Sequence, residues 1–119
     1  RKVIAQYDNA GLYCDFVLDK IIQKYESQDC LLIFFSDHGE EVFESRDFCG
    51  HASSSTAPAP SYLYKIPFFV WESSFFREKH PLIMEQFMSE STKVFCTSQF
   101  SRWIVQKTGL SEYLSVRGL

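Results

Sequence analysis

A run of six apolar residues, Cys30 to Phe35, places the tightest constraint on how this chain can fold. The run is too short for a helix, it does not alternate between apolar and polar residues, and polar residues bound it on both sides. Such a run is typical of a strand that is covered on both faces, as in a parallel sheet. We therefore expect a buried parallel strand that ends at Ser36.

The segment before this strand has the pattern of a long helix. Between Val3 and Tyr25, apolar residues recur at steps of three and four, which places them on one face of a helix. We expect an amphipathic helix that packs on one side. A helix followed by a buried strand indicates the α/β class.

After Glu40 the chain enters a long polar loop and then returns to regular structure. Residues 41–64 show no periodicity and include the run Ser53–Ser55. A loop of this length in a compact domain is usually functional or disordered. The apolar run Ile66–Trp71 predicts a second buried strand. Two helices should follow, one that begins near Pro81 and one that ends at a C-cap on Gly109.

Composition excludes several classes of partner. The 119 residues fit one domain, and with 45% apolar residues and a net charge of -3 the chain is neither disordered nor basic enough to suggest nucleic acid or an anionic membrane surface. No apolar run approaches the roughly 20 residues of a membrane-spanning helix. The chain starts without Met and directly in helical register, so we expect residues 1–119 to be a fragment of something longer, and soluble as given.

Asp37 and His38 are the strongest candidates for a metal site. Ligands bind outside the carboxyl ends of strands in open α/β sheets, and these two residues directly follow the expected strand. Asp oxygen and His nitrogen both bind zinc at about 2.0 to 2.2 Å. Gly39 would let the backbone turn sharply, because glycine tolerates positive φ. His51 in the polar loop is a third candidate, whereas His80 is expected to be a surface residue. The alternative is that Asp37 or Ser36 only caps a helix beginning at Glu40.

Three motifs carry a resemblance to a known family. They are SDHGE (Ser36–Glu40), the preceding helix YDNAGLYCDFVLDKII (Tyr7–Ile22) and the later strand KIPFFVWES (Lys65–Ser73). Together they resemble the C-terminal part of the sulfatase-like catalytic domain of bacterial phosphoethanolamine transferases, in the branch that modifies the lipopolysaccharide core. The resemblance covers essentially the whole chain. It implies a fragment of an alkaline phosphatase-like sandwich, with a mostly parallel sheet flanked by helices.

The resemblance also implies a role for each candidate residue. Asp37 and His38 match the adjacent pair that binds the first zinc, and His51 matches the loop His that serves a second metal or contacts the phosphoryl group. His51 is followed by Ala52 and Ser53 rather than by the Thr-Pro of the lipid A-modifying branch, which leaves its role more open. The family's Thr nucleophile and a further Glu ligand lie upstream. No catalytic nucleophile is therefore expected in this chain, and residues 1–119 alone should be inactive.

For the complete protein, the resemblance implies transfer of phosphoethanolamine from phosphatidylethanolamine to the lipopolysaccharide core through a covalent Thr intermediate. The cofactor would be one or two zinc ions, with Mn²⁺ or another divalent metal as an alternative. The enzyme would act at the periplasmic face of the bacterial inner membrane, held there by an N-terminal part outside this chain. Two other functions stay open. One is a sulfatase or phosphodiesterase-type hydrolase of the same superfamily, and the other is a non-enzymatic α/β module with an adventitious cation site.

Overall fold

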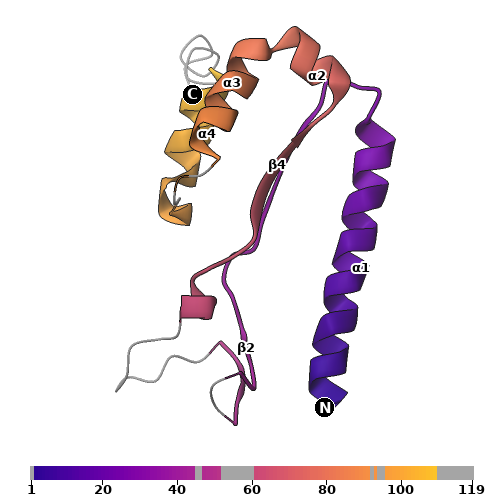
Figure 1. Ribbon diagram of the computed structural model, residues 1–119, viewed down its shortest axis with the longest axis vertical. Coiled ribbons are helices and arrows are strands. Elements are labelled where there is room, and N and C mark those ends of the chain that lie inside the picture. The colour runs from indigo at the N-terminus through magenta and orange to yellow at the C-terminus, as the bar shows by residue number, and fades with distance from the viewer. Residues whose placement is uncertain (1, 45–46, 52–60, 92, 94–95, 110–119) are drawn as a thin grey trace, which may run out of the picture.

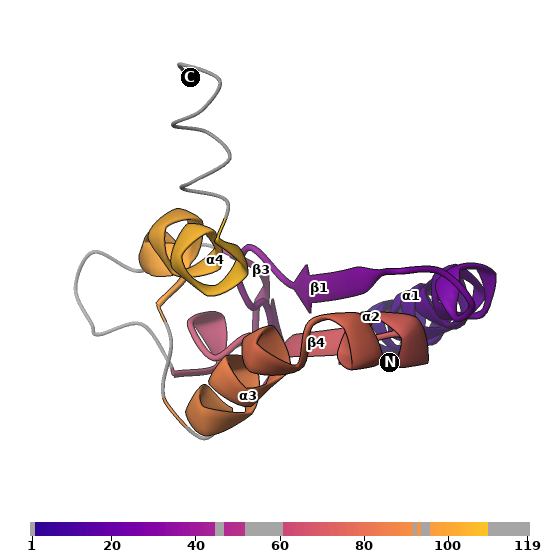
Figure 2. The same cartoon turned by 90° about the horizontal axis from the view of Figure 1, so that it is seen from above.

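The computed structural model describes residues 2–44, 47–51, 61–91, 93 and 96–109. In chain order its elements are α1 (Lys2–Tyr25), β1 (Leu31–Phe35), β2 (Glu41–Val42), β3 (Cys49–Gly50), η1 (Ser61–Leu63), β4 (Phe68–Glu72), α2 (Ser74–Lys79), α3 (Pro81–Glu90), η2 (Thr97–Gln99) and α4 (Phe100–Thr108). β1 and β4 form a ribbon in the middle of the molecule, with α1 on one side and α3 and α4 on the other (Figure 1). The view from above in Figure 2 shows the same order. This mixture of helices and strands agrees with the predicted α/β class.

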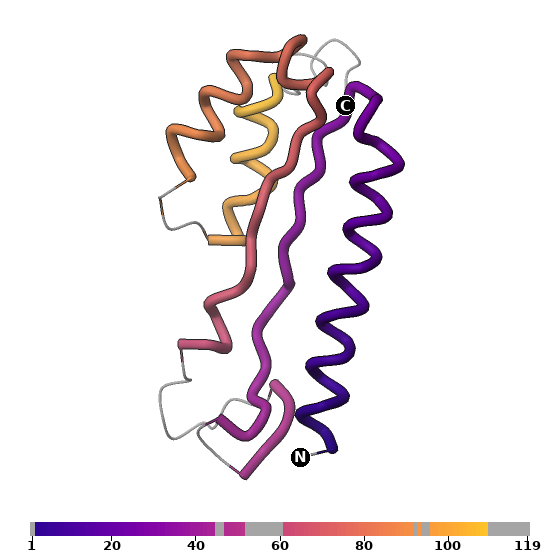
Figure 3. The backbone as a smooth tube through the Cα atoms, turned by 45° about the vertical axis from the view of Figure 1, so that its right-hand side comes forward, coloured from indigo at the N-terminus to yellow at the C-terminus, as the bar shows by residue number. Residues whose placement is uncertain are grey.

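Helix α1 confirms the long helix expected before the strand. It runs beside the ribbon for most of its length (Figure 3). Four half-buried residues at steps of four, four and three form one face of it: Cys14, Leu18, Ile22 and Tyr25. Three large apolar residues are exposed on its other side: Leu12, Tyr13 and Phe16. Because no residue of α1 is fully buried, the predicted packing on one side is present but shallow.

The two predicted strands are present and pair with each other. β1 and β4 are antiparallel, with Leu31 opposite Glu72 at one end and Phe35 opposite Phe68 at the other. The rings of Phe35 and Phe68 stack at a centroid separation of 5.9 Å, and those of Phe34 and Phe69 at 5.2 Å. Such cross-strand aromatic pairs stabilise a ribbon and fix its register. The paired Phe residues of the sequence therefore hold the two strands together.

The predicted parallel sheet is not seen among the described residues, and the parallel direction expected for Leu31–Phe35 is wrong for its partner β4. An apolar run without alternation indicates cover on both faces, and it carries no information about the direction of the neighbouring strand. Parallel neighbours need a crossover connection, usually a helix. In the described part of the connection between β1 and β4 there are only a hairpin and the short η1 turn.

The segment predicted as a loop contains a small hairpin. β2 and β3 pair antiparallel, with Glu41 opposite Gly50 and Val42 opposite Cys49. Strands of two residues are too short to show an apolar pattern, which is why the sequence does not reveal them. The serine-rich part of the predicted loop, 52–60, lies outside the described residues.

The buried core is small. Among the described residues, four apolar ones are buried, one in β2, one in η1 and two on α3: Val42, Leu63, Met84 and Phe87. The Trp103 ring of α4 lies 5.0 Å from that of Phe87, and its Nε1 donates to Glu90 Oε2 at 2.8 Å, so its ring packs on α3 while its N–H is satisfied. α4 ends at Gly109 with φ of 68°, the left-handed C-cap that the sequence predicted.

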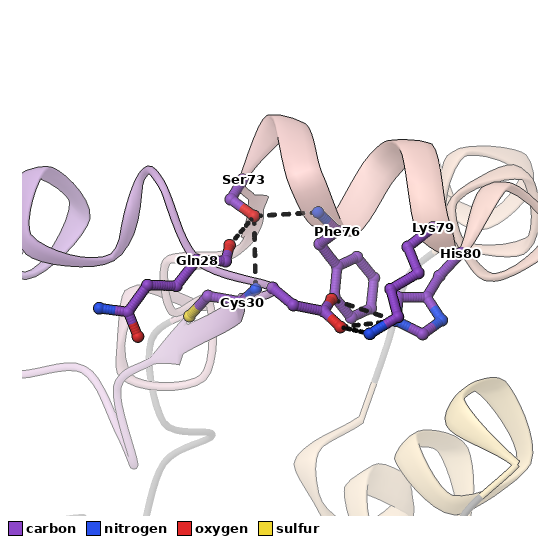
Figure 4. Close-up of polar contacts among 7 residues, drawn as sticks. Gln28, Cys30, Ser73, Phe76, Lys79 and His80 are labelled. Carbon is purple, nitrogen blue, oxygen red and sulfur yellow. Dashed lines mark hydrogen bonds and ion pairs between the residues drawn. The ribbon is translucent and has the colours of Figure 1, made fainter.

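Ser73 joins the beginning of β1 to the beginning of α2, as Figure 4 shows. Its Oγ accepts hydrogen bonds from the backbone N–H of Phe76 at 3.0 Å and of Cys30 at 3.3 Å, and donates to the carbonyl of Gln28. Its side chain is almost fully buried, at 1% exposure. One hydroxyl therefore caps α2 and also fixes the turn that leads into β1.

The Ser73→Ala variant should be less stable by about 2 kcal/mol, because it loses the cap of α2 and leaves the partly buried backbone groups that bond to the hydroxyl without a partner there. The measurement is the free energy of unfolding in urea. Ser74→Ala is the matched control, since Ser74 is exposed at the first turn of the same helix and should change stability little. Equal unfolding midpoints for the two variants would contradict the role assigned to Ser73.

Asp29 makes a second contact between the same elements. Its carboxylate lies 2.6 Å from Lys79 Nζ and 3.1 Å from His80 Nε2. The hydrogen bond from Lys79 lowers the pKa of Asp29, with a smaller contribution in the same direction from His80. His80 is thus half-buried and paired with a carboxylate at the beginning of β1. None of the described helices combines the length and the apolar character that crossing a membrane requires.

Candidate metal centre

The residues after β1 form a compact turn that contains Asp37 and His38. The Ser36 hydroxyl donates to the carbonyl of His38 at 2.7 Å, and the backbone N–H of His38 donates to Asp37 Oδ1 at 3.0 Å. Asp37 is exposed and His38 is half-buried. The chain then enters strand β2 at Glu41. The alternative that Asp37 caps a helix is therefore wrong, because no helix begins there.

The small hairpin brings His51 back to this turn. Glu41 and Gly50 are opposite each other, and His51 follows Gly50 directly, so it returns to the level of the residues just before β2. The rings of His38 and His51 are stacked, with centroids 3.8 Å apart and planes inclined by 30°. The structure thus places the two candidate histidines in contact, although a long stretch of sequence separates them.

Both histidines use the same hydrogen-bond acceptor. The Nδ1 atom of His38 lies 2.9 Å from the carbonyl oxygen of Gly39, and that of His51 lies 3.1 Å from the same oxygen. A carbonyl oxygen only accepts hydrogen bonds, and its two lone pairs can serve two donors. Each Nδ1 therefore carries the hydrogen, and the Nε2 of each neutral ring keeps its lone pair. This is the arrangement found in metal-binding histidines, whose second nitrogen donates to a carbonyl or carboxylate.

The Asp37 and His38 side chains can reach one ion. Asp37 Oδ2 and His38 Nε2 are 3.7 Å apart. Two ligands of a tetrahedral zinc ion, each bound at about 2.1 Å, are separated by about 3.4 Å, so a small adjustment brings both atoms onto the same metal. The donors, one carboxylate and one imidazole, are of the kinds that zinc prefers.

The described residues do not complete a metal site. Among them, no group of three or more His, Cys, Asp or Glu side chains is arranged to hold an ion. Asp37 and His38 converge, His51 lies against His38, and His80 contacts Asp29 before β1, at the other end of the strand. Of the three predicted ligands, Asp37 and His38 are close enough to bind one ion, and His51 is stacked on His38.

Gly39 is needed for a reason other than the predicted one. It does not adopt a positive φ. Instead, its backbone N–H donates to the carbonyl of Leu63 at 3.1 Å, and a Cβ at this position would lie 1.9 Å from the carbonyl oxygen of Tyr62. Only a residue without a side chain allows the η1 turn to approach this closely. Sequence analysis missed the contribution of η1, because nothing in its short sequence distinguishes it from the rest of the polar loop.

A match to a protein-family model shows to which family this chain belongs. The family model described as Sulfatase matches residues 1–103. This chain belongs to the sulfatase family. The match includes all the residues discussed above as candidates for the metal site, so the family resemblance inferred from the motifs is confirmed.

Within the sulfatase family, the chain is similar to several phosphoethanolamine transferases. It is 41% identical over 86 residues to phosphoethanolamine transferase EptA of Helicobacter pylori, covering 71% of this chain and 16% of that protein. It is 35% identical over 77 residues to phosphoethanolamine transferase EptC of Escherichia coli (strain K12), covering 63% and 13%. Phosphoethanolamine transferase CptA of Salmonella typhimurium is 36% identical over 77 residues, with the same two coverages. No solved structure is significantly similar to the chain. The aligned part is thus a small share of each relative.

Proposed function

We propose that this chain contributes metal ligands to the active site of a phosphoethanolamine transferase, with Asp37 and His38 on one zinc ion. The observation that carries the proposal is that His38 and His51 both donate a hydrogen bond from Nδ1 to the Gly39 carbonyl. The lone pair on each Nε2 then stays available to bind a metal ion. The similarity to three phosphoethanolamine transferases supports the reaction class.

The residues of this chain have separate tasks in the proposed site. The Gly39 carbonyl orients the two imidazoles. Asp37 provides a negative charge beside His38, which favours a cation at the point between them. His51 is placed to bind a second ion or an oxygen of the phosphoryl group. When bound, zinc, or Mn²⁺ in its place, would lower the pKa of a coordinated hydroxyl and offset the charge on the phosphoryl oxygens.

The reaction we propose for the complete protein has two displacement steps. A Thr oxygen from outside this chain forms a bond to the phosphorus of phosphatidylethanolamine, the bond from phosphorus to diacylglycerol breaks, and the Thr proton ends on the diacylglycerol oxygen. A hydroxyl oxygen of the lipopolysaccharide core then forms a bond to the phosphorus, the bond from phosphorus to the Thr oxygen breaks, and the hydroxyl proton ends on the Thr oxygen, which restores the nucleophile. These substrates place the enzyme at the periplasmic face of the inner membrane.

Hydrolysis of a sulfate ester or phosphodiester is the second candidate function, and the Sulfatase family match favours it. The same ligands could serve either reaction, because both involve attack at a tetrahedral centre that carries charged oxygens. The two functions differ in the group that accepts the transferred unit, which is lipopolysaccharide in one case and water in the other.

The test compares both reactions in the intact protein. Detergent-solubilised protein is given phosphatidylethanolamine with a labelled headgroup together with lipopolysaccharide, and in parallel an aryl sulfate. We expect label on the lipopolysaccharide, a loss of about 100-fold or more in Asp37→Asn, and no hydrolysis of the sulfate ester. Asp19→Asn is the matched control, because Asp19 lies exposed on α1. Sulfate ester hydrolysis without transfer, or transfer that does not depend on Asp37, would overturn the proposal.

A further inference from the structure

Glu41 is a charged residue that is completely buried, at 0% exposure. It stands three positions after His38, at the beginning of the hairpin. A buried carboxylate is unfavourable unless hydrogen-bond donors meet it, so its position is strongly tied to its partners. One of these partners is the Tyr62 hydroxyl, which donates to Glu41 Oε2. The contact joins two segments that are distant in sequence, β2 and η1.

The η1 turn contacts both parts of the candidate metal centre. Through the carbonyl of Leu63 it accepts a hydrogen bond from Gly39, in the turn that carries Asp37 and His38. Through Tyr62 it holds Glu41, in the strand that pairs with Gly50. Because His51 follows Gly50 directly, the place of His51 depends on where this hairpin is held.

We propose that Glu41 and Tyr62 are positioning residues that keep His51 stacked on His38. They act through the hairpin, whose register sets the distance between His51 and the Gly39 carbonyl. This inference rests on the proposed function and takes His51 as a ligand of the second ion, so that its position affects zinc affinity. The contact itself, however, can be tested without any metal.

The first experiment is a double-mutant cycle on zinc affinity, measured by calorimetric titration of the intact protein with zinc. Tyr62→Phe removes only the hydroxyl, and we expect it to weaken zinc binding about tenfold, the usual effect of losing a group that orients a ligand. In the His51→Ala background the same change should have no further effect, because the residue that Tyr62 positions is gone. A general loss of stability would instead weaken binding equally in both backgrounds.

Two further variants make the cycle specific. Tyr64→Phe is the matched control, since Tyr64 lies just beyond η1 with 69% exposure, and it should bind zinc as wild type does. Glu41→Gln is the conservative variant, because its amide oxygen can still accept from Tyr62, and it should retain most of the affinity. Equal losses in Tyr62→Phe and Tyr64→Phe would overturn the proposal.

The second experiment does not depend on metal. Nitrogen-15 NMR of the histidine rings in the metal-free protein reports which ring nitrogen carries the hydrogen. We expect the Nδ1–H form for both His38 and His51 in wild type, and loss of this form for His51 alone in Tyr62→Phe. If wild type binds no zinc, the proposed function fails while this measurement still decides the inference. An unchanged His51 spectrum in Tyr62→Phe would overturn it.

Discussion

Zinc binding is expected to weaken by about 100-fold in both Asp37→Ala and His38→Ala. A complete zinc site supplies about 10 to 16 kcal/mol from four ligands, so one lost ligand removes roughly 3 kcal/mol, which corresponds to two orders of magnitude in affinity. The measurement is calorimetric titration of the intact protein with zinc at neutral pH. Both variants should lose a similar factor, because the two side chains bind the same ion.

His80→Ala provides the control for this titration. It removes an imidazole that contacts Asp29 instead of the candidate site, so zinc affinity should stay within a factor of about two, an allowance for indirect effects between distant sites. A loss in His80→Ala as large as that in His38→Ala would mean that zinc binds histidines without regard to the turn. Full affinity in Asp37→Ala would show that the carboxylate is not a ligand.

Alanine at position 39 is expected to cost about 3 kcal/mol of stability and to abolish zinc binding at micromolar concentrations. The new Cβ would lie 1.9 Å from the Tyr62 carbonyl oxygen, which belongs to the backbone and cannot turn away as a flexible side chain can. Either η1 or the turn must move. Moving the turn displaces the carbonyl on which both histidines depend. Urea unfolding and zinc titration measure the two effects separately.

Gly11→Ala is the matched control for this prediction. A Cβ at Gly11 meets no atom within 4 Å, and alanine is a better helix former than glycine in the middle of α1. This variant should be more stable by about 0.5 to 1 kcal/mol and should bind zinc normally. If Gly39→Ala behaved like Gly11→Ala, the close approach of η1 would have no role in forming the site.

The elements that a sequence pattern can define were predicted correctly. A long series of apolar residues at steps of three and four predicts a helix, and α1 extends from Lys2 to Tyr25. The two apolar runs became β1 and β4 for the same reason. Their antiparallel pairing was missed, because strand direction depends on the connection, and the connecting segment has no regular pattern of its own.

In the candidate site, too, residues adjacent in sequence could be predicted, whereas contacts between residues distant in sequence could not. Asp37 and His38 could be found because a carboxylate and an imidazole directly follow a buried strand. His51 could be suggested as a third member, but its contact with His38 depends on the register of a two-residue hairpin. Gly39 was predicted to be needed for its backbone freedom, but it is needed because there is no room for a side chain beside Tyr62. This could not be predicted, because Tyr62 is far along the chain.

The β1–β4 ribbon has a consequence for how the metal centre is assembled. Phe35 and Phe68 are the last pair in the ribbon, and every residue assigned to the centre lies between them in the chain. Bringing together the ends of a loop of about 30 residues costs about 3 kcal/mol in chain entropy beyond a constant. The pairing of β1 with β4, to which the stacked phenylalanine rings contribute, offsets this entropy cost before any ion is present. The candidate ligands of this chain therefore lie in a loop whose ends strand pairing has already brought together.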